Sequence, residues 1–194
     1  MNKKNQLAFS TITFFGLTLF LISLEGATEV LGLGRDVSPQ EIKLWDIDVR
    51  PDGAGLPLGA GTVVQGEVVY RQQCVGCHGD KGVGGVNAAL VGRISGDAFP
   101  FGQDPLVKKT IGNYWPYATT VFDYIRRAMP YARPGSLSND EVYSLVAYLL
   151  YLNDIVDRDK RIDAENLATI RMPSRNRFVV DDRIPIKYNH PEGG

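Results

Sequence analysis

Two cysteines and a histidine stand together in this chain, in the run Cys74-Val75-Gly76-Cys77-His78. This spacing places two thiols three positions apart on one helical turn, with an imidazole directly after them. The pattern is typical of covalent attachment of a c-type haem, in which the thiols bond to the porphyrin and the histidine binds the iron. We therefore predict one haem c, attached through Cys74 and Cys77, with His78 as the proximal iron ligand.

Two other kinds of site use a C-x-x-C pair. A thioredoxin-like redox dithiol uses the two thiols alone, and a zinc site needs further ligands of the right type. The chain has only two cysteines and two histidines, and the second histidine, His190, lies near the C-terminus. Because so few cysteines and histidines are present, the haem is the favoured interpretation. A redox pair or a partial zinc site remains the alternative.

The sixth iron ligand is a choice among methionine, histidine, lysine and an open position. His190 stands in a polar tail, which is a poor platform for a ligand. Met129 and Met172 are both followed by proline, so their places in the chain decide between them. Met129 lies 51 residues after His78, just before a predicted helix, whereas Met172 lies beyond that helix.

We predict Met129 as the distal ligand. The alternatives are Met172, an open iron, or a Met129 that simply fills core space, as methionine often does. With both axial positions filled no substrate reaches the iron, so this ligand set predicts an electron carrier rather than a haem catalyst.

The N-terminus has the layout of an export signal. Lys3 and Lys4 precede an apolar run from Leu7 to Leu24, and we assign residues 1–27 to this segment. The run is also long enough for an uncleaved membrane anchor over residues 7–24. Export to the periplasm fits covalent haem attachment. The formal net charge of −1 and the scattered basic residues give no support to a nucleic-acid partner.

The 194 residues suit one domain with extensions. We expect an extended, Gly- and Pro-rich arm over 28–61, a haem domain over 62–153 and a polar surface tail over 154–194. Ser38-Pro39 in the arm favours a short helix through Trp45. The apolar spacing after Trp45 alternates with period two, which predicts an extended segment.

Apolar periodicity predicts helices over residues 62–73, 119–128 and 138–152. The last begins with the capping box Ser138-Asn139-Asp140-Glu141. Gly66 in the first helix indicates a close approach of another helix, and we expect Ala147 as its partner. A short helix around residues 164–167 is expected in the tail.

The order of these features resembles a class I cytochrome c: a helix, C-x-x-C-H, a wrapping loop, Met129-Pro130 and a C-terminal helix. The resemblance implies an all-α fold of three to five helices around one haem. In that family a loop carbonyl accepts a hydrogen bond from the proximal imidazole. The matching stretch here is Val86-Asn87-Ala88-Ala89-Leu90-Val91-Gly92, with Ala88 where the family has proline.

A closer resemblance covers more of the chain. Residues 41–53 (EIKLWDIDVRPDG) and 112–130 (GNYWPYATTVFDYIRRAMP) resemble the cytochrome c subunit of sulfite or sulfane dehydrogenases of sulfur-oxidising bacteria. The resemblance implies a molybdenum-cofactor dehydrogenase subunit as electron donor and another periplasmic cytochrome c as acceptor. The alternatives are a free-standing shuttle to a terminal oxidase and a haem enzyme such as a thiosulfate dehydrogenase or peroxidase.

Polar side chains in the second of these blocks are candidates for the haem surroundings. Trp115 has an N–H that needs an acceptor when buried, and the Arg126 guanidinium suits a carboxylate. We expect Arg126 or Trp115 to contact the haem propionates, with ordinary core or partner contacts as the alternative.

Overall fold

The computed structural model describes residues 33–94, 98–101 and 103–179, and it divides into two units between Trp45 and Asp46. The expected export segment 1–27, its apolar run 7–24 and His190 lie outside the described residues. In the described ranges no helix is long and apolar enough to cross a membrane.

The first unit contains the short helix α2, Pro39–Trp45, as the Ser-Pro pair predicted. Its start is closed by two reciprocal bonds: Glu41 N donates to Ser38 Oγ at 3.2 Å, and Ser38 N donates to Glu41 Oε2 at 2.9 Å. None of the residues of α2 is buried. The helix is therefore held by its cap and by local contacts rather than by a core of its own.

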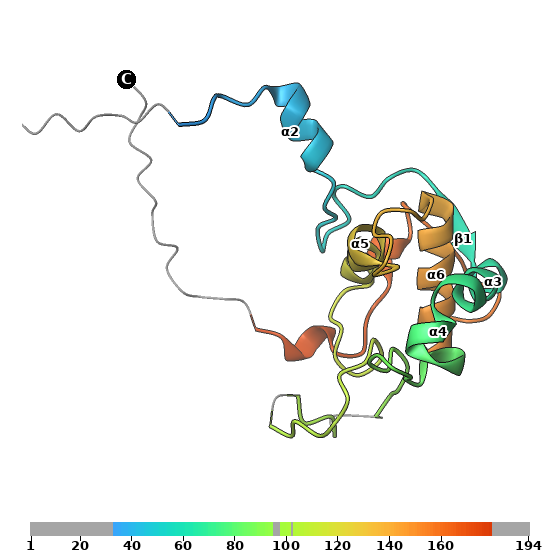
Figure 1. The fold of residues 1–194 in the computed structure, drawn as a ribbon. Helices are drawn as coiled ribbons and strands as arrows, with labels where there is room; N and C mark the ends of the chain where they lie inside the picture. The colour runs from blue at the N-terminus through green and yellow to red at the C-terminus, as the bar shows by residue number, and fades with distance from the viewer. Residues whose placement is uncertain (1–32, 95–97, 102, 180–194) are drawn as a thin grey trace, which may run out of the picture. The chain divides into compact units, whose positions relative to one another are not determined.

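The second unit is mostly helical (Figure 1). Its helices are α3 (Val63–Gln73), α4 (Val75–His78), α5 (Ala118–Ala128) and α6 (Asn139–Leu152), with short 3₁₀ helices at Asp80–Gly82, Leu167–Thr169 and Arg175–Arg177. The three helices predicted from periodicity are confirmed to within one residue at each end. The Ser138 capping box is present: Glu141 N donates to Ser138 Oγ at 3.3 Å, and Ser138 N donates to Glu141 Oε2 at 2.7 Å.

A two-stranded sheet departs from the all-α expectation. Strand β1 (Ala60–Thr62) pairs antiparallel with β2 (Arg161–Asp163), and Gly61 lies opposite Ile162. The short helix expected around 164–167 is shifted to a 3₁₀ helix at Leu167–Thr169. Residues 164–166 form a turn, in which the Asp163 carboxylate accepts the N–H groups of Glu165 and Asn166, both at 3.1 Å. Such local side-chain bonds offer the backbone an alternative to a helix.

The segment after α6 also differs from the expected surface tail. Ile162 and Leu167 are fully buried, Met172 is 3% exposed, and all three belong to the main core. They stand five residues apart, a spacing that matches neither a helix nor a strand and so gives no periodic signal. Residues 161–174 thus complete the domain rather than merely covering it.

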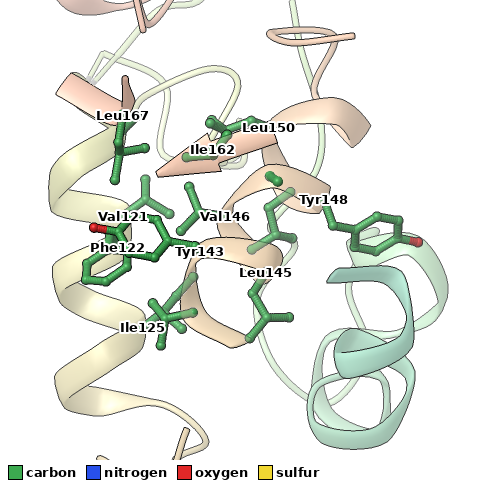
Figure 2. Packing of buried hydrophobic residues seen from close by; sticks show 14 of the residues in the cluster. Val121, Phe122, Ile125, Tyr143, Leu145, Val146, Tyr148, Leu150, Ile162 and Leu167 are labelled. Carbon is green, nitrogen blue, oxygen red and sulfur yellow. The ribbon is translucent and has the colours of Figure 1, made fainter. Parts of the chain in front are cut away.

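Helix α6 lies at the centre of the core. Its residues from Val142 to Leu150 are all buried, and a helix that is apolar on all sides is expected to be enclosed. Figure 2 shows side chains of α5 facing those of α6, and the residues it labels there are Val121, Phe122, Ile125, Tyr143 and Val146. The Phe122 and Tyr143 ring centroids are 4.4 Å apart.

Helix α3 packs on another side of α6 at very short range. A Cβ at Gly66 would lie 1.8 Å from Ser144 O and 2.7 Å from Tyr148 Cβ. The predicted close approach is therefore present, but the partner is the Ser144 backbone rather than Ala147, which is buried in the core cluster. Only glycine lets the α3 backbone reach this distance.

Replacing Gly66 by alanine should therefore lower the free energy of unfolding. The methyl group must push α3 away from α6, and overpacking of this kind costs about 1–3 kcal/mol, despite the better helix propensity of alanine. Urea denaturation followed by circular dichroism measures the change. Val68→Ala, at a position 53% exposed on the same helix, is the control and should change stability by less than about 0.5 kcal/mol. Equal stabilities for the two variants would contradict the close contact.

Candidate functional site

The C-x-x-C-H run forms a single helical turn at the end of α3. Cys74 ends α3 and begins α4. Its carbonyl oxygen accepts the N–H of Cys77 at 3.1 Å and the N–H of His78 at 3.0 Å. The turn therefore presents two thiols and an imidazole from one rigid segment; Cys77 is exposed, and Cys74 and His78 are half-buried.

The His78 ring has a fixed orientation. Its Nδ1 lies 2.8 Å from Ala88 O, and because a carbonyl oxygen only accepts, Nδ1 carries the proton. In the neutral imidazole the other ring nitrogen, Nε2, then has a free lone pair, which is the form that binds a metal. The resemblance to class I cytochromes implied a bond at Ala88, and it is present although alanine replaces the family's proline.

The loop after His78 folds back on the same turn. Gly84 N donates to His78 O at 2.9 Å, and Asn87 N donates to Cys77 O at 2.9 Å. Further along, Leu90 N donates to Gly82 O at 2.8 Å. These bonds fix the loop that carries Ala88.

The Cys74 thiol lacks the lowered pKa of a reactive redox cysteine. Burial, and to a lesser extent the neighbouring Cys77, raises the pKa of Cys74 to about 11, whereas reactive cysteines of the thioredoxin type have lowered values. In the described residues no group of three or more His, Cys, Asp or Glu side chains is placed to hold a metal ion. The redox and zinc alternatives thus gain no support from the described ranges.

The two candidate methionines lie in different surroundings. Met129 directly follows α5, with extended backbone and its N–H donated to Ile125 O at 3.0 Å. Its side chain is half-buried against the core. Met172 is buried within the core cluster itself. The backbone of Met129 is therefore bonded to the end of α5, and its side chain is partly exposed. Both properties suit a residue that binds a cofactor.

Trp115 and Arg126 both have protein partners. Trp115 Nε1 donates to Thr120 Oγ1 at 2.8 Å, and its ring packs edge-on against Tyr124. Indole has a single donor, so in this structure that donor is not available to a propionate. Arg126 Nη1 donates to Ile47 O at 2.8 Å, and a guanidinium has further N–H groups to spare.

Arg126 is part of a polar ladder that the sequence reasoning missed. Three side chains on one face of α5 bind three alternate residues of the extended segment 46–51, through the backbone. The bonds are Thr119 Oγ1 to Pro51 O at 3.1 Å, Val49 N to Asp123 Oδ1 at 2.8 Å, and Arg126 Nη1 to Ile47 O at 2.8 Å. Two sequence patterns together could have indicated the ladder. The polar residues of α5 lie at i, i+4 and i+7, which places them on one face of a helix, and the residues that they bind alternate with period two along the extended segment.

Asp123 is the charged centre of this ladder. It is 8% exposed and also accepts Arg127 Nε at 2.8 Å. Burial by itself raises the pKa of the Asp123 carboxyl, but the hydrogen bonds from Arg127 and Val49 and the positive charges of Arg127 and Arg126 outweigh it, so the pKa is lowered. The folded state thus favours the carboxylate.

Comparison with known proteins gives three matches. Residues 61–149 match the family model described as cytochrome c oxidase, cbb3-type, subunit III. A thiosulfate dehydrogenase of Stutzerimonas stutzeri (strain A1501) is 30% identical over 96 residues, which make up 48% of this chain. The chain spans only 28% of the length of that protein.

A solved structure matches over a larger part of the chain. It is a chain in the crystal structure of the sulfane dehydrogenase SoxCD from Paracoccus pantotrophus, with a TM-score of 0.68 and 42% sequence identity. The match covers 81% of this chain and 76% of that one.

The lowered pKa of Asp123 predicts a pH-dependent contribution to stability. A carboxyl whose folded pKa lies below its unfolded value of about 3.9 stabilises the fold above that pH and loses the contribution as the pH falls through the folded pKa. Asp123→Asn should therefore cost about 1–2 kcal/mol near pH 6, and less below about pH 4. Urea unfolding of both proteins across this range measures the difference. A cost that stays constant down to pH 2.5 would show that the charge does not matter.

Proposed function

Because the chain belongs to the class I cytochromes c and is related to the Sox-type proteins of sulfur oxidation, we propose that it is the single-haem electron-transfer subunit of a sulfite or sulfane dehydrogenase. Cys74 and Cys77 attach haem c, and His78 and Met129 bind its iron. The group supplies a one-electron Fe(III)/Fe(II) couple when bound. The observation that carries this proposal is the His78 geometry, with two thiols on the same turn and Nε2 left free by the bond to Ala88 O.

The two ends of the proposed site come from well-anchored elements. His78 stands on a turn fixed by the bonds to Cys74 O, and Met129 stands at the end of α5, one face of which is buried in the core. Rigid ligands suit electron transfer, because little reorganisation accompanies a change in iron charge. A methionine opposite a histidine also raises the reduction potential relative to two histidines.

We propose a molybdenum-cofactor dehydrogenase subunit as the electron donor and another periplasmic cytochrome c as the acceptor. The 42% identity to a chain of the SoxCD structure, over 76% of that chain, supports a partner of this kind. The arm, residues 28–61, and the segment beyond residue 153 exceed what a bare shuttle needs. Location in the periplasm is part of the proposal, since haem c is attached outside the cytoplasm.

A second candidate is a haem enzyme, and the similarity to a thiosulfate dehydrogenase favours it. An enzyme of this kind needs an open or exchangeable position on the iron. The two candidates therefore differ in the state of Met129, which is directly measurable.

Replacing Met129 by alanine in the haem-loaded chain should abolish the far-red absorption band of methionine-ligated ferric haem and lower the reduction potential, because a sulfur ligand favours the ferrous state. Spectroelectrochemistry measures both properties. Met172→Leu is the matched control, since it conserves volume in the core and should leave the band and the potential unchanged. Loss of the band in Met172→Leu, or its absence from the unaltered protein, would reject Met129 as the ligand.

The partner proposal predicts that the native protein, isolated from periplasm and membranes, brings molybdenum with it. Its haem should be reduced on addition of sulfite or a sulfane-sulfur donor, because the partner passes substrate electrons to it. Metal analysis and absorption spectra of the isolated complex test this. A lone cytochrome without molybdenum and without substrate-driven reduction would leave a free-standing electron shuttle.

A further inference from the structure

Asn153, the residue that follows α6, has a buried side-chain amide that makes four hydrogen bonds inside the domain. It is 1% exposed. Its Oδ1 accepts the N–H groups of Gly92 and Gly112, both at 3.1 Å. Its Nδ2 donates to Leu90 O at 3.3 Å and to Leu149 O at 2.8 Å. All four hydrogen bonds that an amide side chain can make are therefore formed.

The backbone around Asn153 is shaped to receive this side chain. A Cβ at Gly112 would lie 2.5 Å from Asn153 Oδ1 and 2.9 Å from Gly92 O, so no larger residue fits there. Ile111 N also donates to Leu90 O, at 3.1 Å. The amide thus joins three segments: the end of α6, residues 90–92 and residues 111–112.

One of these segments leads directly to the proximal histidine. Ala88, whose carbonyl accepts the His78 Nδ1 proton, lies two residues before Leu90. On its near side the loop is held by Tyr70 of α3, whose hydroxyl donates to Gly79 O at 2.8 Å, and by backbone bonds to Cys77 O, His78 O and Gly82 O. Asn153 is the side chain that ties the far side of this loop to the buried helix.

We propose that Asn153 is a positioning residue for His78, which acts through residues 88–92 and sets the strength of the Nδ1–H to Ala88 O hydrogen bond and, through it, the reduction potential of the haem. The inference rests on the proposed haem c function. A strong bond at Nδ1 makes the imidazole a more basic ligand, which stabilises the ferric state. A looser loop weakens the bond and raises the potential.

The test is the reduction potential of the isolated haem-loaded chain with Asn153→Leu, which has a similar volume and no polar atoms. We expect the ferrous state to be favoured about threefold more, a rise of about 30 mV at 59 mV per tenfold for one electron. In NMR spectra the His78 Nδ1 proton should exchange faster with solvent. Asn153→Asp, which keeps the two accepted bonds, is the second variant should the leucine variant fail to fold.

Ile162→Ala is the matched control, because Ile162 is equally buried, lies on β2 and has no polar atom to bind the loop. It should lower stability without moving the potential or the Nδ1 proton exchange. An unchanged potential in both Asn153 variants would overturn the inference and leave the haem function intact. An unaltered chain that carries no haem would instead refute the proposed function, and the inference with it.

Discussion

The contact between Gly66 of α3 and the Ser144 backbone of α6 is the constraint on which the rest of the domain depends. It lets the two helices approach until a Cβ would overlap Ser144 O. The turn with Cys74, Cys77 and His78 continues directly from α3, so its position relative to the core is fixed by this contact. Helix α6 is in turn enclosed by α5 and the β1–β2 pair, which explains why nine consecutive residues from Val142 are buried.

A core this dense requires that its polar groups be satisfied inside it. In the described residues no buried side-chain nitrogen or oxygen lacks a hydrogen-bond partner, although Asn113, Asn153 and Ser174 all lie inside the domain. An unpaired buried group costs about 1–3 kcal/mol, so each of these side chains also specifies where a loop passes. Irregular segments around the proposed haem site are therefore positioned by amide and hydroxyl groups rather than by regular secondary structure.

The chemistry and the main helices were readable from the sequence because their signals are local. C-x-x-C-H is contiguous, and the Ser138 box marks the start of α6. A second box, in which Gln65 N donates to Thr62 Oγ1 at 3.3 Å and Thr62 N donates to Gln65 Oε1 at 3.0 Å, was also local but went unrecognised. The features that could not be predicted depend on residues far apart in the chain. They are the pairing of β1 with β2 and the bonds from Asn153 to Gly92 and Leu90, which precede it by 61 and 63 positions. The burial of Ile162, Leu167 and Met172 was also missed, because their five-residue spacing has no helical or strand period.

The polar ladder on α5 joins residues 47–51 of the arm to the helix that precedes Met129. Asp123 and Arg126 bind the backbone of Val49 and Ile47, and Met129 is the first residue after the last residue of this helix. The residues that follow, from Tyr131 to Ser136, are exposed. On the helix side the Met129 N–H donates to Ile125 O at 3.0 Å, so the arm stabilises the element from which the proposed distal ligand emerges.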